Sequence, residues 1–183
     1  MWQAYWNRRS RDFTMVAVAQ DVGGAERVGP VIAQHHVEFP VLVDRSSELG
    51  RALRFRIVPF GVFVDAQGLI RYRHAEDFDI ADPRVRFELD EFLSGRPVEG
   101  RGTEERMAPE ALELFARGAD EYARGRREEA LSTWREALSH DPDNFVIRSQ
   151  IWAVEHPEHF YPTVDREWQA LQLLKEGYDK PLP

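Results

Sequence analysis

The chain has 183 residues, of which 43% are hydrophobic and 31% are charged, which excludes a chain too polar to build a core. Its 24 Lys and Arg residues against 32 Asp and Glu residues give a net charge of −8, which argues against non-specific binding of nucleic acid or anionic lipid. Cysteine is absent, so the chain supplies no disulfide, no thiolate metal ligand and no cysteine nucleophile.

The sequence pattern divides the chain into two parts. Residues 1–95 combine short apolar runs with helical periodicity, which is typical of an α/β domain, whereas residues 109–183 show helical periodicity alone. Residues 96–108 are rich in Gly and charge and poor in apolar side chains, which predicts a linker. The expected fold class is therefore an α/β domain followed by an all-α region.

Aromatic side chains mark the first element, because Trp2, Tyr5 and Trp6 have the i, i+3, i+4 spacing of a buried helix face. A nearly continuous apolar run over 13–20 is typical of a strand that is covered on both sides. The elements expected in chain order are a helix over 2–9, a strand over 13–20, a helix over 26–36, a strand over 40–44, a short helix capped by Ser46 or Ser47, a hairpin over 57–65 and 69–73, and a helix over 83–95.

Three blocks of this part resemble the thioredoxin-like redoxins, the ResA-like thiol-disulfide oxidoreductases and thiol-specific peroxidases. The blocks are Val16–Asp21, Phe39–Asp44, and Ile57–Asp65 with the following Gly68. In that family a proline before the hairpin is held in the cis form and faces the redox motif, and Pro59 matches it. The resemblance implies a thioredoxin-like fold with a substrate groove at Val58, Pro59 and Phe60.

The redox motif of the family has no counterpart in this sequence. In the family a strand and a Cys-x-x-Cys motif precede the first helix, whereas this sequence begins at Met1, already inside that helix. Three interpretations stay open: a natural cysteine-free derivative, a fragment, or a reading frame that begins upstream. We favour the third, because a subset of these redoxins carries selenocysteine in a W-A-x-x-U-G-x-x-C motif whose UGA codon is easily read as a stop. Ile147–Tyr161 also resembles that subset.

The activity implied by the resemblance is thiol–disulfide exchange or peroxide reduction, with protein thiols or disulfides as partners. Because exchange needs a thiolate, the chain alone is expected to be inactive, with no catalytic residue and no cofactor. The alternative is a cysteine-free interaction module in which the helical region binds a partner peptide. No signal peptide opens the sequence, which favours the cytoplasm, although an upstream start would hide such a signal.

The helical region contains one period of a tetratricopeptide-like pattern over 111–144. The pattern places small residues where two helices cross, a tryptophan beside them and a proline after the second helix. The matching residues are Leu114, Gly118, Ala130, Trp134, Ala137 and Pro142. Arg117 and Glu121 depart from the usual leucine and aromatic residue. A single repeat offers little concave surface, so we favour packing on the first part over a peptide-binding groove.

Trp168, Leu171 and Leu174 have the spacing of a last helix. The histidines at 35–36 and at 156 and 159 offer too few ligands for zinc, so no metal site is predicted.

The resemblance also predicts an incomplete sheet. The absent strand would lie between the strands at 13–20 and 60–65 and would leave backbone groups unpaired on both sides. The side chains uncovered would be Val16, Val18, Val62 and Val64. We therefore expect the isolated chain to self-associate through these edges.

Overall fold

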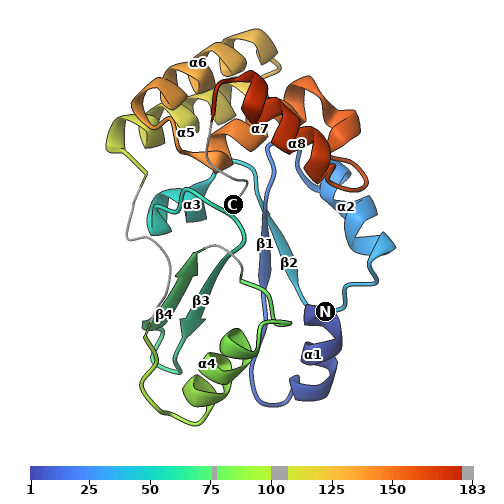
Figure 1. The fold of residues 1–183 in the computed structure, drawn as a ribbon, viewed down its shortest axis with the longest axis vertical. Coiled ribbons are helices and arrows are strands. Elements are labelled where there is room, and N and C mark those ends of the chain that lie inside the picture. Colours follow the sequence, from blue (N-terminus) through green and yellow to red (C-terminus); the bar gives the residue numbers. More distant parts are fainter. Residues whose placement is uncertain (76–77, 100–106, 179–183) are drawn as a thin grey trace.

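The computed structural model describes residues 1–75, 78–99 and 107–178, and it shows a mixed α/β protein. The elements are α1 (Trp2–Arg9), β1 (Ala17–Gln20), α2 (Ala25–Gln34), β2 (Val41–Asp44), α3 (Glu48–Leu53), β3 (Phe60–Val64), β4 (Ile70–Ala75), α4 (Pro83–Leu93), α5 (Pro109–Ala123), α6 (Arg127–His140), α7 (Phe145–Glu155), a 3₁₀ turn (Pro157–His159) and α8 (Arg166–Lys175). Helices α5 to α8 gather at one end of the molecule, and α1 and α4 lie at the other (Figure 1).

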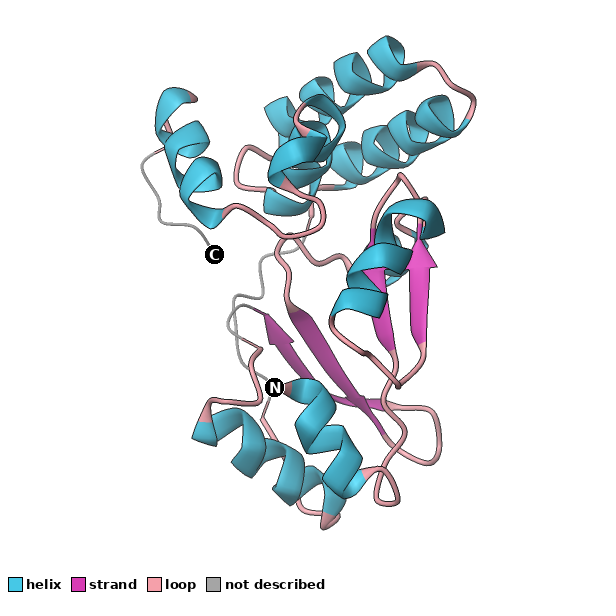
Figure 2. Cartoon of the chain, turned by 90° about the vertical axis from the view of Figure 1, so that its right-hand side faces the viewer, coloured by secondary structure: helices cyan, strands magenta, loops and turns pink. Residues whose placement is uncertain are grey.

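The four strands form two separate two-stranded sheets, which Figure 2 shows as distinct pairs. β1 is parallel to β2, with Ala17 opposite Val41, whereas β3 is antiparallel to β4. Gly68 has a φ of 79°, which suits the tight turn between β3 and β4 because glycine has no Cβ. The order of elements agrees with the sequence-based expectation, but the strands do not join into one sheet.

A compact apolar cluster fixes the β3–β4 hairpin against α1 and α4. Tyr5 of α1, Phe63 of β3 and Val85 of α4 are buried in it, and the Phe63 ring stacks on Tyr72 with centroids 4.4 Å apart. Asp82 caps α4 by accepting a hydrogen bond from the Arg84 N–H group, as the Pro83 start of this helix suggests. The aromatic spacing of α1 therefore predicted the buried face correctly at Tyr5.

The helical end is organised around α5 and α6, which pack as a hairpin (Figure 1). Trp134 is fully buried, and its indole Nε1 donates a hydrogen bond to the Phe115 carbonyl oxygen at 3.1 Å. A Cβ atom on Gly118 would lie 2.3 Å from that indole nitrogen, so only glycine allows the two helices to approach this closely. α7 closes the unit with Val146 and Ile147, which contribute to the same core.

The core of the helical end is shared with the α/β part. Phe55, from the loop after α3, and Val22, from the loop after β1, are buried in the same cluster as Trp134. Most of the predicted linker at 96–108 lies outside the described residues, but Met107 is 1% exposed and belongs to this cluster. The helical region is therefore packed on the first part through a continuous apolar interface.

Two strand expectations were too long. The strand expected over 13–20 begins only at Ala17, because its partner β2 begins at Val41. The pairing starts with the hydrogen bond that the Ala17 N–H group donates to the Pro40 carbonyl oxygen. The hairpin strand expected over 57–65 begins at Phe60, since β4 ends opposite that residue at Ala75.

The expected serine cap of α3 was wrong. The carboxylate of Asp44, at the end of β2, accepts hydrogen bonds from the N–H groups of Glu48 and Leu49, each at 2.8 Å. Ser47 is the residue before the helix but makes no side-chain cap.

The last helix was predicted, but the face that it buries was not. α8 turns Leu173 inward against Phe145 and Trp152, with Trp168 packed beside them, whereas Leu171 and Leu174 are exposed. Glu176 fixes this helix by accepting hydrogen bonds from Trp152 Nε1 at 2.7 Å and from Arg148. No helix in the described ranges is long and apolar enough to cross a membrane.

Candidate functional site: the groove between the two sheets

A large apolar groove separates β1 from β3, and we call it the inter-sheet groove. Its volume is about 1540 Å³. Its walls are residues 12–18 and Gln20 on one side and residues 58–67 on the other. Side chains of α1, α3 and α4 and the segment 95–98 are among the other parts of the lining. The groove lies where the absent strand was expected. In the described residues, the two sheets are not joined by a strand ladder across it.

Within the described residues, the β1 wall of the groove carries an unpaired backbone edge. Successive residues of a strand direct their backbone groups to opposite sides, and the Ala17 N–H group bonds to Pro40 on the β2 side. The backbone groups of Val16 and Val18 therefore face the groove. Val16 is 49% exposed and Val18 is partly exposed, in agreement with the expectation that both would be uncovered.

The β3 wall is the second open edge, because β3 pairs with β4 on one side and with no other strand of the described ranges. Val64 is 48% exposed and Val62 is partly exposed, in agreement with the expectation that both would be uncovered.

One end of the β1 edge is closed by a side chain from α7. The Gln150 Nε2 atom donates to the Gln20 carbonyl oxygen at 3.0 Å, and its Oε1 atom accepts from the Val22 N–H group at 3.1 Å. A carboxamide carries the same donor and acceptor as a peptide group, so Gln150 pairs with β1 as one residue of a neighbouring strand would. The open part of the edge therefore stops at the level of Gln20.

The expected substrate-groove residues Val58, Pro59 and Phe60 all line the inter-sheet groove. The Val58–Pro59 peptide bond is cis, as expected, and Pro59 is exposed. Val58 and Phe60 pack against the helical core, and the Phe60 ring stacks on Phe55 with centroids 5.1 Å apart. The structure thus brings these three residues together at the end of the groove nearest the helical unit.

Backbone bonds from the helical unit hold the loop that leads to Pro59. The Met107 N–H group donates to the Arg54 carbonyl oxygen, and the Val146 N–H group donates to the Arg56 carbonyl oxygen, both at 3.1 Å. The Arg56 guanidinium also forms a 2.6 Å ion pair with Asp141, whose side chain is only 6% exposed. The helical unit therefore positions one wall of the groove.

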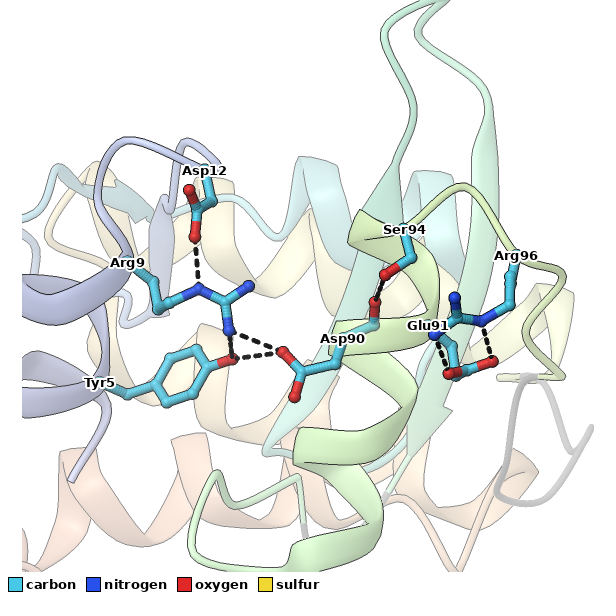
Figure 3. A network of polar contacts seen from close by, with 7 residues as sticks. All are labelled: Tyr5, Arg9, Asp12, Asp90, Glu91, Ser94 and Arg96. Atoms are coloured by element: carbon cyan, nitrogen blue, oxygen red, sulfur yellow. Dashed lines mark hydrogen bonds and ion pairs between the residues drawn. The ribbon is translucent and has the colours of Figure 1, made fainter.

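The charged residues of the groove lining are already paired within the described chain. They are Asp12, Asp65, Arg71 and Arg96. Asp12 pairs with Arg9, and Arg96 pairs with Glu91 through Nε at 2.6 Å (Figure 3). The N–H group of Leu69 and the guanidinium of Arg71 hold the pKa of Asp65 below its usual value. The groove consequently offers an apolar interior with no free charge from these four residues.

A polar cluster lies beyond Gln20, at the carboxyl end of β1. Tyr161 donates a hydrogen bond to Asp21, and the Arg27 guanidinium lies over the Tyr161 ring, 5.1 Å from its centroid. Burial and the hydrogen bond to Asp21 raise the pKa of Tyr161 above its usual value. Sequence analysis did not predict this cluster, because Asp21 and Tyr161 are far apart along the chain.

The tetratricopeptide-like positions are mostly buried, but they face the helical core rather than an open surface. Gly118, Ala130, Trp134 and Ala137 are buried, and Leu114 is partly buried. Pro142 is exposed after the end of α6, and its carbonyl oxygen accepts a hydrogen bond from Arg148 at 2.8 Å. The buried members of this set therefore stabilise the hairpin from inside the helical core.

Comparisons with family models, with curated proteins and with solved structures found no match to this chain. Within residues 1–75, 78–99 and 107–178, no group of three or more His, Asp or Glu side chains is placed to hold a metal ion.

Proposed function

We propose that this chain is the scaffold of a thioredoxin-like redoxin whose redox-active Cys or Sec lies on a segment outside these 183 residues. The observation that carries the proposal is the inter-sheet groove, which separates a parallel pair from an antiparallel pair. A single strand inserted there would join the two pairs in the order β2, β1, inserted strand, β3, β4.

The position of Pro59 supports the same proposal. A redox motif that follows the inserted strand would leave the groove near Gln20, at the carboxyl end of β1, if the strand runs parallel to β1. Pro59 is exposed, and its neighbours Val58 and Phe60 pack at that end against the cluster that contains Val22. A thiolate or selenolate there would attack a substrate disulfide, form a mixed disulfide or a selenenyl sulfide, respectively, and release the other sulfur as a thiolate.

The residues of this chain would contribute binding and position in that reaction. Val58, Pro59 and Phe60 would contact the substrate next to the reacting sulfur. The helical unit, which we propose to be tetratricopeptide-like, would hold the Pro59 loop through Met107 and Val146.

The second candidate function is an interaction module without redox chemistry. It is favoured by one observation, the exposure of Leu171 and Leu174 on the outer face of α8. The partner would then bind the outside of α8, because the inner side of the α5–α6 hairpin is filled by Phe115 and Trp134.

The test begins with the nucleotides upstream of the Met1 codon. An in-frame UGA or Cys codon near codons for Trp-Ala supports the redoxin, and an in-frame stop without that motif contradicts it. The chain extended by about 30–40 residues, enough for the strand and motif of a βα unit, should then reduce insulin disulfides or a peroxide. The matched controls are the same protein with the redox residue replaced by Ser and the 183-residue chain, both of which should be inactive.

A further inference from the structure

We propose that the inter-sheet groove binds a short, uncharged, apolar peptide in extended conformation, paired through its backbone with β1 on one side and with β3 on the other. This inference rests on the proposed function in one respect, because the same groove would hold the strand that precedes the redox motif. It goes further in stating that the 183-residue chain accepts such a strand from a separate molecule.

The backbone geometry selects a strand as the occupant. β1 ends beside α7, where Gln150 meets Gln20, whereas β3 begins beside the helical core at Phe60. The two strands thus run in opposite directions (Figure 1). An inserted strand is parallel to one of them and antiparallel to the other, and both ladders are allowed. A compact ligand would satisfy few of these backbone groups.

The size of the groove also favours a peptide over a small molecule. Small-molecule pockets usually enclose about 300–1,000 Å³, and this groove has a volume of about 1540 Å³.

The lining specifies the chemistry of the side chains. Trp2 of α1 and Leu89 of α4 contribute to the lining, and so do Leu49 and Leu53 of α3. A strand between such helices carries apolar residues on both faces rather than an alternating pattern. The four charged residues of the lining already have partners, so a charged side chain on the peptide would be buried without compensation.

The length of the paired segment follows from the two edges. On the β1 side the backbone groups that face the groove are those of Val16 and Val18, and β3 has five residues. Gln150 occupies the β1 edge at Gln20 and Val22, so the peptide cannot continue the ladder past that level. We therefore infer a paired segment of about three to five residues, within the usual length of strands in globular proteins.

The experiment uses a fluorescein-labelled octapeptide, Lys-Thr-Val-Leu-Val-Ile-Gly-Lys, in which the apolar centre is the segment to be paired and the terminal lysines lie outside it. Its fluorescence anisotropy is followed as the 183-residue chain is added. We expect saturable binding with one peptide per chain. Two further peptides carry N-methyl groups on alternate residues, one on each edge of the strand. Each should bind at least tenfold more weakly, because each loses the hydrogen bonds to one wall.

Chain variants locate the binding. Val18→Asp places a charge in the groove and should weaken binding at least tenfold. Leu42→Asp is the matched control, since Leu42 is 58% exposed on β2 and lies outside the groove lining, and it should bind like the unaltered chain. The N-methylated peptides test the proposal independently of the folding of either variant.

Three results would overturn the proposal. They are the absence of saturable binding, full binding by one of the N-methylated peptides, and a chain dimer in sedimentation that Val18→Asp dissociates, which would assign the groove to a second copy. The peptides contain no thiol, so these results are separate from the redox assay. An active extended chain with no peptide binding contradicts only this inference, and peptide binding beside an inactive extended chain contradicts only the redoxin.

Discussion

The helical end of the molecule buries its apolar side chains more completely than the α/β part does. In the helical unit, Ala130, Trp134, Ala137 and Ile147 are all fully buried, and the hairpin and α7 cover one another. In the α/β part, Val16 and Val64 are about half exposed and two sheet edges face an open groove.

The difference follows from how each kind of element satisfies its backbone. A helix pairs its own N–H and C=O groups, so the helical unit only needs neighbours for its apolar face. A strand needs a partner on each side, so a sheet that lacks a strand keeps unpaired groups however well its helices pack. Stability and binding capacity should therefore be concentrated at opposite ends of the chain.

The largest expected effect is at the junction of the two regions. Asp141→Ala should lower the free energy of unfolding by about 3–5 kcal/mol, because it removes one partner of a buried ion pair. Asp141 also accepts a hydrogen bond from the Asn144 side chain at 3.0 Å. Urea denaturation followed by circular dichroism measures the change. The control is Glu136→Ala, whose ion pair with Arg117 is more than half exposed and should contribute less than about 1 kcal/mol. Equal losses in both variants would contradict the prediction.

A matched valine pair compares the interiors of the two regions directly. Val146 of α7 is 2% exposed and Val64 of β3 is 48% exposed. Val146→Ala should lower the free energy of unfolding by about 2 kcal/mol, whereas Val64→Ala removes the same atoms and should change it by less than about 0.5 kcal/mol. A larger loss from Val64→Ala, measured by the same denaturation, would mean that the groove is closed in solution.

The cap of α3 provides a smaller and more local effect. Asp44→Ala should cost about 1 kcal/mol, since the carboxylate accepts from two N–H groups at the start of the helix. Ser47→Ala should change stability much less, because the structure gives the Ser47 hydroxyl no hydrogen-bond partner. If thermal denaturation showed the opposite ranking, the serine cap expected from the sequence would be correct.

The smallest expected effect is a dependence on alkaline pH. The pKa of Tyr161 is raised, so the folded state holds the phenol proton more tightly than the unfolded state does. This contribution to stability is complete below the ordinary tyrosine pKa of about 10 and is lost as the pH rises above it. The unaltered chain should therefore lose stability more steeply above pH 10 than Tyr161→Phe does. Parallel slopes in urea titrations would exclude this role for Tyr161.

Local sequence signals predicted the elements but not the contacts between them. The aromatic spacing at Trp2, Tyr5 and Trp6 was sufficient for α1, and Pro83 and Gly95 were sufficient for the limits of α4, because helix ends depend on nearby residues. Strand β1 was overestimated because the length of a strand depends on its partner rather than on its own apolar run.

In the candidate site, some lining residues were predicted from the sequence, whereas the side chain that closes the β1 edge was not. Val58, Pro59 and Phe60 were predicted as substrate-groove residues from the resemblance to the redoxins, and the structure places them in the lining of the inter-sheet groove. Gln150 was missed, because a glutamine in a helix gives no local sign that it will pair with a strand edge near Val22. The cap of α3 was missed for a similar reason, because the carboxylate that accepts the hydrogen bonds belongs to Asp44 of the preceding strand.

The two backbone bonds that hold the Pro59 loop also constrain the order of events during synthesis. The carbonyl oxygens of Arg54 and Arg56 accept hydrogen bonds from the N–H groups of Met107 and Val146. Both arginines leave the ribosome well before these donors do. Domains generally fold as units from the amino terminus during translation, but here the first part cannot complete this wall until α7 has been made. The nascent α/β part should accordingly stay open to proteases and chaperones until nearly the whole chain has emerged.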